Sequence, residues 1–256
     1  MRWLGVDVKP DFLLRRIGYN GTPRYEFIYD TEGRLIRLYH SGFFSEGYTL
    51  YEYNKQGTIE SRKYVASNEK LEDRISFKLD DQSRIVEIED YTAQSDFEEV
   101  GARSTFDYDA SGRLASKLYR IPGQPATYLE EYTFDAAKRL IQMQRTSHPD
   151  EAGEYVIFRD EFTPGSIPVY SHWNNLVLLL SASQAEGSIW EMFSLAIQRT
   201  TWDDDGEIVA SKRTETYDHE FNADGYLIRQ NLSIEYLTSP GAATILEMTY
   251  EYTDNL

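Results

Sequence analysis

The stretch of sequence that decides the fold is Tyr29-Asp30-Thr31-Glu32-Gly33-Arg34-Leu35. It follows a pattern in which an apolar residue precedes Asp or Asn, two variable residues, usually Gly, one more residue, and then Leu or Ile. The chain of 256 residues contains seven copies of this pattern. Because a repeated unit buries its apolar face only against its neighbours, such a repeat predicts the architecture of nearly the whole chain. The further copies span residues 53–59, 79–85, 108–114, 134–140, 202–208 and 221–227.

Each copy has the composition of a β-hairpin turn. The Asp or Asn side chain can accept a hydrogen bond from the backbone two residues further on, and Gly tolerates the positive φ that closes the turn. Ser83 and Lys138 replace that Gly in two copies, and we expect each to cost about 1 kcal/mol of backbone strain. In four copies an Asp and an Arg would form an exposed ion pair that contributes about 0.2–1 kcal/mol. These pairs are Asp30 with Arg34, Asp80 with Arg84, Asp109 with Arg113, and Asp135 with Arg139.

The turn also predicts how the flanking strands pair. With a three-residue loop closed by the Asp and the Arg, Tyr108 lies opposite Leu114. Phe106 then lies opposite Ser116 on the same face of the sheet. That face should carry cross-strand pairs of aromatic and aliphatic side chains. The same count gives the pairs Tyr29 with Leu35, Tyr53 with Ile59, Leu79 with Ile85, Phe134 with Leu140, Trp202 with Ile208, and Phe221 with Leu227.

Seven hairpins and a last strand around Tyr250 predict an all-β fold, because antiparallel strands joined by short turns stay adjacent in a sheet. We expect a meander of about 14–16 strands, rolled into a barrel or an open superhelical sheet. The repeat runs through most of the chain, so a single domain over residues 1–256 is predicted. An aromatic content of 14% fits strands better than helices.

An irregular segment interrupts the hairpins at about residues 163–185. It holds two prolines, a Trp173-Asn174-Asn175 corner and the apolar run 176–180, and a run that is apolar on every side must be buried on every side. One interpretation is a plug that closes one end of the rolled sheet. The alternative is a functional insert, because binding residues gather on loops set on a rigid scaffold. Trp173, Asn174 and Asn175 are therefore the candidate binding residues.

The composition excludes several partners and chemistries. The formal net charge of −17 repels nucleic acid and anionic membranes. Glu26, Glu52 and Asp107 alternate with the aromatic positions, which disfavours insertion of the domain into a bilayer. The absence of cysteine excludes a thiol nucleophile and thiolate metal sites. The acidic run 203–207 coincides with a turn of the repeat and needs no calcium ion to explain it. No catalytic residue, metal or cofactor is predicted.

The stretches Tyr108–Leu114 and Tyr29–Leu35 resemble the Y-D-x-x-G-R-L core of Rhs/YD repeats, whose long arrays form large β-shells. The whole chain resembles a shorter group, bacterial exported lipoproteins of unknown function with a porin-like β fold, through residues 19–30, 174–177 and 221–226. This resemblance implies export to the periplasm or the outer cell surface through an N-terminal lipid anchor. Mature lipoproteins of that kind begin with a lipidated Cys, and this chain contains no Cys. A native start at the first Met would instead indicate a cytoplasmic protein.

From these features we expect a non-enzymatic, exported binding or scaffold module of the bacterial cell envelope, with an envelope protein or a glycan as its partner. Two alternatives stay open. One is a glycan-acting enzyme with carboxylates in the sheet interior, which a cleft with two facing carboxylates of raised pKa would favour. The other is an intracellular interaction protein that shares only the turn motif.

Overall fold

The computed structural model describes residues 12–41, 46–54, 58–136, 139–147, 155–164, 196–204, 209–223, 226–236 and 243–254. Within these ranges the chain forms sixteen β-strands and one short 3₁₀ helix, η1. The predicted all-β antiparallel meander is confirmed. The elements are β1 (Phe12–Tyr19), β2 (Thr22–Tyr29), β3 (Leu35–Ser41), β4 (Glu46–Tyr53), β5 (Thr58–Val65), β6 (Leu71–Leu79), β7 (Ile85–Tyr91), η1 (Ala93–Ser95), β8 (Val100–Tyr108), β9 (Leu114–Arg120), β10 (Ala126–Phe134), β11 (Leu140–Ser147), β12 (Tyr155–Pro164), β13 (Ala196–Asp204), β14 (Val209–Phe221), β15 (Leu227–Tyr236) and β16 (Thr244–Asp254).

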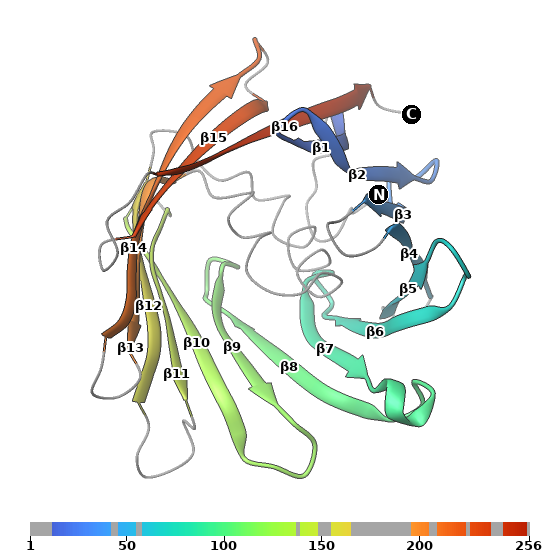
Figure 1. The fold of residues 1–256 in the computed structure, drawn as a ribbon. Coiled ribbons are helices and arrows are strands. Elements are labelled where there is room, and N and C mark those ends of the chain that lie inside the picture. Colours follow the sequence, from blue (N-terminus) through green and yellow to red (C-terminus); the bar gives the residue numbers. More distant parts are fainter. Residues whose placement is uncertain are drawn as a thin grey trace.

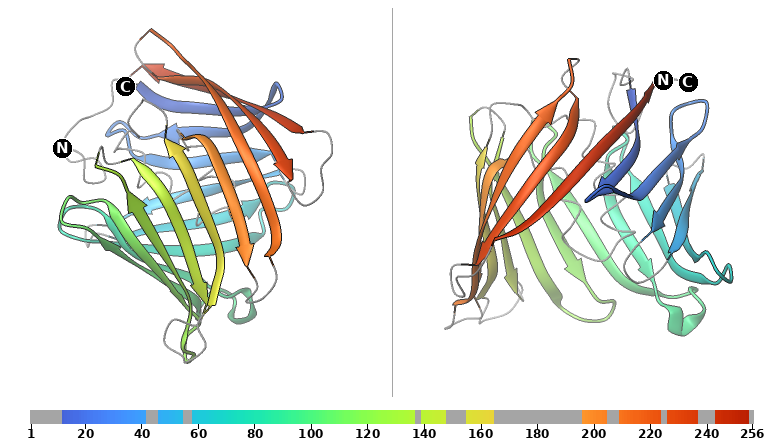
Figure 2. Two further views of the ribbon diagram at one scale, coloured as in Figure 1. Left: turned by 90° about the vertical axis from the view of Figure 1, so that its left-hand side faces the viewer. Right: turned by 45° about the horizontal axis from the view of Figure 1, so that its top comes forward.

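The strands follow one another around a barrel in the order of the sequence (Figure 1). Each strand pairs with its neighbours in the chain, and β1 also pairs with β16, with Phe12 opposite Asp254 and Tyr19 opposite Met248. This last pairing closes the sheet. Figure 2 shows the strands inclined across the wall, which is the tilt that a twisted sheet adopts when it closes on itself.

The two ends of the barrel differ in their connections. We call the end at which β2, β4, β6, β8, β10 and β14 pass into the next strand the repeat end, because six copies of the sequence pattern occupy those connections. The opposite end is called the far end. The connections described there are residues 20–21, 66–70, 92–99 with η1, and 121–125.

The turn at Asp30 shows how the repeat works. Asp30 Oδ1 accepts hydrogen bonds from the backbone N–H groups of Glu32 and Arg34, each 2.9 Å long. Its Oδ2 accepts from Arg34 Nε at 2.7 Å and lies 2.6 Å from Nη2, which confirms the predicted ion pair. Gly33 has a φ of 77°, and Ser83 has a φ of 62° at the equivalent position, as the turn requires. The pairs Asp80 with Arg84, Asp109 with Arg113, and Asp135 with Arg139 have the same geometry, at 2.7, 2.6 and 2.6 Å.

The predicted register is correct at the turn and wrong one step beyond it. Tyr108 lies opposite Leu114 as expected, but Phe106 lies opposite Lys117 and not opposite Ser116. A β-bulge after the turn adds one residue to the second strand and shifts the following pairs by one. The shift places Lys117 on the inner face beside Phe106. The same register shift follows the turns between β2 and β3, β6 and β7, β10 and β11, and β14 and β15.

The pairing predicted for Trp202 is also wrong. Trp202 lies opposite Lys212, so it does not pair with Ile208. The reason is the direction of the strand. Pro164 lies opposite Ala196, so β12 ends and β13 begins at the repeat end. The next connection, between β13 and β14, therefore falls at the far end, away from the six other copies.

Aromatic side chains connect one repeat to the next. The Arg34 guanidinium lies over the Tyr53 ring, 5.2 Å from its centre, and the Tyr53 hydroxyl donates to the Leu35 carbonyl oxygen at 2.9 Å. An Asp, an Arg and the Tyr of the following repeat thus form one connected unit. In the same way, the Arg84 guanidinium lies 4.4 Å from the centre of the Tyr108 ring, and the Tyr108 hydroxyl donates to the Ile85 carbonyl oxygen at 2.7 Å.

The inner face of the wall is apolar towards the repeat end and the outer face is charged. The fully buried side chains include Leu35, Ile59, Phe77, Ile85 and Leu227. On the outer face, ion pairs join neighbouring strands. They include Arg62 with Glu52 at 3.6 Å, Arg74 with Glu60 at 3.2 Å, Arg103 with Glu87 at 3.8 Å, and Arg229 with Glu220 at 2.9 Å. Within the described ranges, no helix has the length and apolar character needed to cross a membrane.

Candidate functional site

The binding residues predicted from the sequence, Trp173, Asn174 and Asn175, lie outside the described residues. So do Lys138 and most of the predicted plug. The part of the chain that the structure describes contains no group of three His, Asp or Glu side chains that could hold a metal ion. A candidate site lies at the far end of the barrel, on β2 to β7.

Backbone pairing between β2 and β3 stops near the far end, where side chains replace it. The last backbone pair is Tyr25 with His40. Beyond it, Pro23 has no N–H group to donate to a ladder. Arg24 Nη1 donates instead to the Ser41 carbonyl oxygen at 3.0 Å, and Ser41 Oγ donates to the Pro23 carbonyl oxygen at 2.8 Å. The backbones of the two strands therefore separate at the rim of the barrel.

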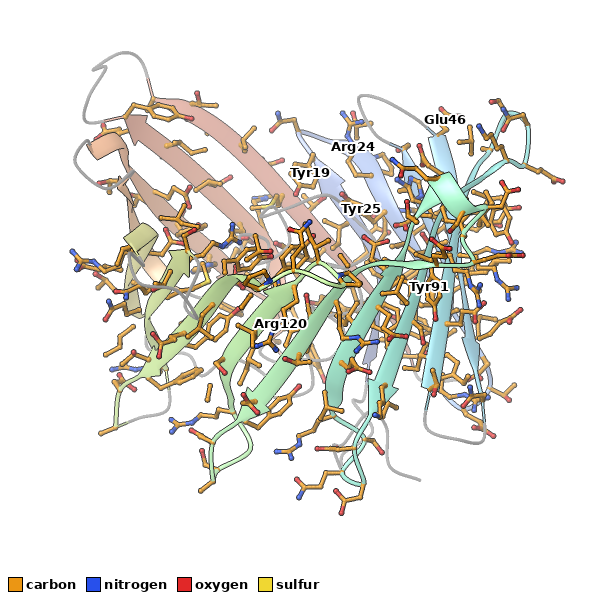
Figure 3. All side chains as sticks on the ribbon, turned by 90° about the horizontal axis from the view of Figure 1, so that it is seen from below. Tyr19, Arg24, Tyr25, Glu46, Tyr91 and Arg120 are labelled. Atoms are coloured by element: carbon orange, nitrogen blue, oxygen red, sulfur yellow. The ribbon has the colours of Figure 1, made fainter. Side chains whose placement is uncertain are left out.

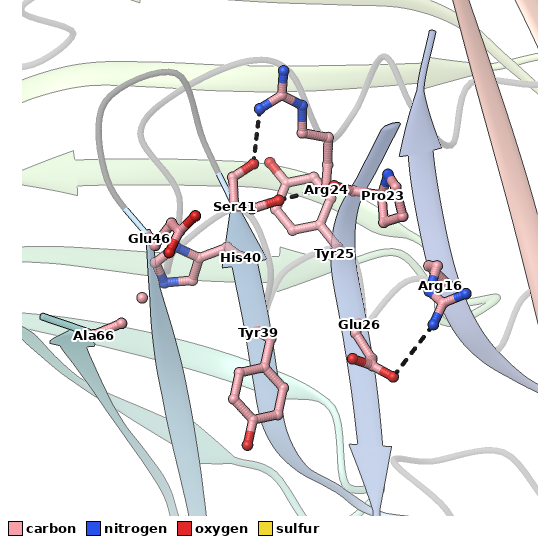
Figure 4. A pocket seen from close by; sticks show the side chains of 11 residues that line it. Arg16, Pro23, Arg24, Tyr25, Glu26, Tyr39, His40, Ser41, Glu46 and Ala66 are labelled. Atoms are coloured by element: carbon pink, nitrogen blue, oxygen red, sulfur yellow. Dashed lines mark hydrogen bonds and ion pairs between the residues drawn. The ribbon is translucent and has the colours of Figure 1, made fainter. Parts of the chain in front are cut away.

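A pocket of about 330 Å³ lies where these strands separate, and we call it the rim pocket. Figure 3 places Arg24, Tyr25 and Glu46 at one end of the barrel, and Figure 4 shows the side chains around the pocket. Its volume is at the lower limit of small-molecule sites, which measure about 300–1,000 Å³. The lining residues with aromatic or charged side chains, or with an imidazole, are Arg16, Arg24, Tyr25, Glu26, Tyr39, His40 and Glu46.

His40 is the most deeply buried polar residue of the rim pocket. It is 7% exposed, and its Nε2 atom has no hydrogen-bond partner among the described residues. The ring crosses β4 where Gly47 has no side chain, because a Cβ atom there would lie 2.6 Å from His40 Cε1. Burial, followed by the positive charge of Lys63, lowers the pKa of His40 to about 4, while the Glu72 carboxylate opposes the shift. The imidazole is therefore neutral at pH 7.

The charged side chains of the rim pocket differ in their pairing. Arg16 is held by two carboxylates, 3.0 Å from Glu251 and 3.6 Å from Glu26. Arg24 spans the gap between β2 and β3. Glu46 is exposed, and its carboxylate forms no ion pair or side-chain hydrogen bond with any described residue. One carboxylate at the mouth of the pocket is therefore available to a ligand.

A row of titratable side chains continues from His40 along the inner face. Lys63 lies opposite Asp73, and a hydrogen bond joins the side chains of Asp73 and Asp90. Burial raises the pKa of Asp73 to about 6, Asp90 adds to the rise, and Lys63 opposes it. Burial also raises the pKa of Asp90. Each of these two carboxyl groups therefore keeps its proton to a higher pH than a solvated Asp does.

Glu130 is a buried carboxylate whose charge is balanced within the protein. Burial alone would raise its pKa, but Lys117 and Arg145, together with the Tyr132 hydroxyl, hold the pKa below its usual range. Arg145 Nε donates to Glu130 at 2.9 Å and the Tyr132 hydroxyl donates at 3.0 Å. Lys117 Nζ lies 3.5 Å away. This cluster needs no ligand, and we assign it to the stability of the barrel.

Sequence reasoning missed the rim pocket. The signals were a Pro at the start of a strand, which marks the end of a ladder, and the pair His40 and Gly47 on the two strands of one hairpin. The proline predicts an opening in the sheet, and the His40–Gly47 pair predicts that the imidazole packs closely on the neighbouring strand. Neither signal on its own indicates that the opening and the buried histidine lie at the same place.

Comparison with known proteins identifies the fold and leaves the function open. No family model and no curated protein matches the chain. The structure is similar to a porin-like protein from Bacteroides uniformis, with a TM-score of 0.59 and 11% identity over 94% of this chain and 95% of that chain. A porin-like protein from Bacteroides vulgatus has a TM-score of 0.46 and 11% identity, over 94% and 98% of the two chains. The Photorhabdus luminescens Tc holotoxin pore has a TM-score of 0.34 and 14% identity, over 91% of this chain and 14% of that chain.

The first of these similarities supports the porin-like β fold that the family resemblance implies. At 11% identity it carries no information about a ligand or an activity. The other two have TM-scores below 0.5 and support no argument. The functional proposal must therefore rest on the site itself.

Proposed function

We propose that this protein is a non-enzymatic binding module of the bacterial cell envelope, and that it binds a glycan in the rim pocket. The observation that carries the proposal is the buried Nε2 atom of His40, which lies beside a pocket of about 330 Å³ and has no partner among the described residues. A buried polar atom without a partner costs free energy, because it loses its hydrogen bonds to water. A ligand in the pocket would supply the missing bond.

The lining of the rim pocket suits a sugar. A sugar ring presents hydroxyl groups around its edge and C–H groups on its faces. Tyr25, which lies opposite His40 on the inner face, provides aromatic surface for the C–H faces. Arg24, His40 and Glu46 provide a donor and two acceptors for the hydroxyl groups. An apolar wall with a few convergent polar groups is typical of small-molecule sites.

The charged side chains on the outer face support a location of the barrel outside the lipid bilayer. Ion pairs such as Arg62 with Glu52 and Arg229 with Glu220 stand where a transmembrane barrel would contact lipid. A Lys or Arg at the bilayer midplane costs about 2–4 kcal/mol.

Export itself rests on the resemblance of the repeats to exported lipoproteins. Fractionation of cells that express the complete gene product tests it, and recovery in the cytoplasm alone would favour an intracellular interaction protein.

The binding test uses the whole chain and a panel of soluble oligosaccharides in titration calorimetry. We expect His40→Leu to weaken binding by tenfold or more, because Leu fills the space but offers no nitrogen. His219→Leu is the matched control, since His219 lies on β14 and its Nε2 is already 3.0 Å from Gln230 Nε2. Equal loss in both variants, or loss in neither, would contradict the rim pocket as the site.

Asp73 favours a second candidate function, a glycan-acting enzyme. A carboxyl group with a pKa of about 6 can exchange protons near neutral pH. Glycosidases, however, hold their two carboxyl groups about 5–10 Å apart, whereas Asp73 and Asp90 are hydrogen-bonded to each other. Binding is therefore better supported. Mass spectrometry of the same oligosaccharides after incubation tests the enzyme, and shortened products that Asp73→Asn abolishes would replace the binding proposal.

A further inference from the structure

Exposed apolar side chains gather on the outer face of β2 to β4. The described part of the chain has five exposed large hydrophobic side chains, and Ile28, Ile36 and Tyr39 are three of them, at 36–39% exposure. Ile28 lies opposite Arg37, and Ile36 and Tyr39 flank Arg37 along β3. Single exposed hydrophobic residues need no explanation, whereas a contiguous group indicates an interaction surface. We call this surface the outer-face patch; it comprises Ile28, Ile36, Arg37, Tyr39, Tyr48 and Leu50.

Arg37 lies within the outer-face patch without an acidic partner. It faces Ile28 across β2 and Leu50 across β4, so its cross-strand neighbours on both sides are apolar. It forms no ion pair with any described residue. Six other arginines of the outer face each have a carboxylate partner, namely Arg16, Arg62, Arg74, Arg103, Arg159 and Arg229.

Two tyrosines hold the Arg37 guanidinium in place. Its central carbon lies 5.5 Å from the centre of the Tyr39 ring and 5.2 Å from the centre of the Tyr48 ring. Nη1 donates to the Tyr39 hydroxyl at 2.8 Å, and the other N–H groups of the guanidinium have no acceptor among the described residues. A cation restrained in this way loses little conformational freedom when it binds a carboxylate.

The arrangement of the rings favours a protein over a glycan on this face. Tyr48 stacks on Tyr64, with 5.2 Å between the ring centres and 23° between the planes, and Arg37 also lies over Tyr48. A sugar stacks on an open ring face, and these rings already contact side chains of the protein itself. Tyr and Arg are instead enriched at the centres of protein interfaces.

We propose that the outer-face patch docks a protein segment that carries an Asp or Glu side chain between apolar residues, with the carboxylate paired to Arg37. The carboxylate supplies the charge that Arg37 lacks, and the apolar residues cover the isoleucines beside it. The net charge of −17 permits this contact, because screening limits its reach to about 8 Å at physiological ionic strength. Glu26, opposite Tyr39, is paired with Arg16 at 3.6 Å. The inference goes beyond glycan binding in the rim pocket and does not depend on it.

Peptide selection tests the proposal with the whole chain. Phage that display random short peptides are selected on the immobilised wild type in the presence of excess soluble Arg37→Gln protein. Because Arg37 does not line the rim pocket, this competitor removes peptides that bind there or elsewhere. We expect the enriched peptides to share an Asp or Glu next to apolar residues. Enrichment of no peptide, or of peptides without a shared carboxylate, would overturn the proposal.

Fluorescence anisotropy with one enriched peptide then measures the ion pair. Replacement of its acidic residue by the corresponding amide should weaken binding to the wild type by about tenfold or more. The Arg37→Gln protein should bind the two peptides equally, because the partner of the carboxylate is gone. A difference that persists in that variant would place the carboxylate elsewhere and overturn the proposal.

Arg103→Gln is the matched control, since it also removes one positive charge from the outer face. Arg103 lies on β8, is paired with Glu89 and lies 3.8 Å from Glu87. The affinity of Arg103→Gln for the peptide should stay within about twofold of the wild type. Equal weakening by Arg37→Gln and Arg103→Gln would show attraction by overall charge alone and overturn the proposal.

Two further measurements separate this surface from the rim pocket and from an acidic glycan. His40→Leu should leave peptide binding unchanged, so the two proposals can fail independently. Loss of the peptide in that variant would place it in the rim pocket and overturn the docking surface. An oligomer of galacturonic acid that binds only when Arg37 is present, while no peptide is enriched, would assign the patch to an acidic glycan and overturn the protein partner.

Discussion

The two ends of the barrel are held together in different ways. At the repeat end, one Asp accepts hydrogen bonds across each turn, and the Arg bound to it contacts the Tyr of the next repeat. At the far end the connections differ in length, and two groups there, His40 and Asp73, have pKa values displaced by burial. Groups that are poorly satisfied by their own protein are often retained because a ligand uses them. We therefore assign stability to the repeat end and place the proposed recognition site at the far end.

The largest expected change in stability comes from a comparison of two turns, one at each end, in which an Asp or Asn side chain accepts hydrogen bonds from the backbone. Asp80 accepts hydrogen bonds from Gln82 and Arg84 backbone N–H groups at 2.9 and 2.8 Å and also binds the Arg84 side chain. Asn68, at the far end, accepts one bond from Lys70 N–H at 3.0 Å. We expect Asp80→Ala to lower the free energy of unfolding by about 2 kcal/mol and Asn68→Ala by about 0.5 kcal/mol in urea denaturation. Equal losses would contradict a difference between the ends.

A second test places the same strained side chain at each end. Gly112 and Gly123 have φ values of 79° and 78°, so Val is strained at both, by more than about 1 kcal/mol. At Gly112 the N–H also donates to the Asp109 carbonyl oxygen at 2.9 Å and closes a turn of the repeat. We therefore expect Gly112→Val to destabilise more than Gly123→Val. Identical urea midpoints for the two variants would show that backbone strain alone decides the cost.

A smaller effect is expected from the link between repeats. Tyr53→Phe keeps the ring under Arg34 and removes the hydroxyl that donates to Leu35. The loss should be about 1 kcal/mol, because the Leu35 carbonyl oxygen loses a partner. Tyr39→Phe is the control, since the Tyr39 hydroxyl accepts a bond from Arg37 on the exposed outer face. We expect less than about 0.5 kcal/mol for that control in the same denaturation experiment.

The turns were predictable from the sequence because their chemistry is local. The Asp, the Gly and the Arg of a turn lie within five residues of one another, and their hydrogen bonds were expected from residue type alone. The bulge after each turn was not predictable in this way, because the inserted residue, such as Ala115 or Val86, has no chemical signature. Its effect is nevertheless large, since it brings Lys117 to the inner face beside Glu130.

The direction of a strand was a second property that local reasoning could not supply. The copy at Trp202 has the right residues, but it lies on β13, a strand that begins at the repeat end and ends at the far end. Whether a turn lies at one end or the other depends on the number of strands before it. The rim pocket required still more distant information, because Arg24 and His40 come from different strands and meet only where the backbone ladder between them stops.

The smallest effect expected in the wild type concerns pH, where two groups of the far end act in opposite directions. The pKa of His40 is lowered to about 4, so between about pH 6.5 and 4 the unfolded chain binds a proton that the folded chain does not. This contribution to stability is lost as the pH falls. The pKa of Asp73 is raised to about 6, so between about pH 6 and 4 the folded chain holds a proton that the unfolded chain has released. This contribution to stability is gained as the pH falls.

Single substitutions should reveal the two opposite dependences of the free energy of unfolding on pH. We expect His40→Leu to gain stability relative to the wild type when the pH falls from about 7 to 5, because the loss caused by the histidine is gone. Asp73→Asn should lose stability relative to the wild type over the same range, since it cannot take up the proton that stabilises the folded state. Carboxylates remote from these positions titrate equally in all three proteins, so the differences between urea midpoints report on His40 and on the coupled pair of Asp73 and Asp90. Changes of the same sign in both variants would contradict the opposite pKa shifts of His40 and Asp73 at the far end.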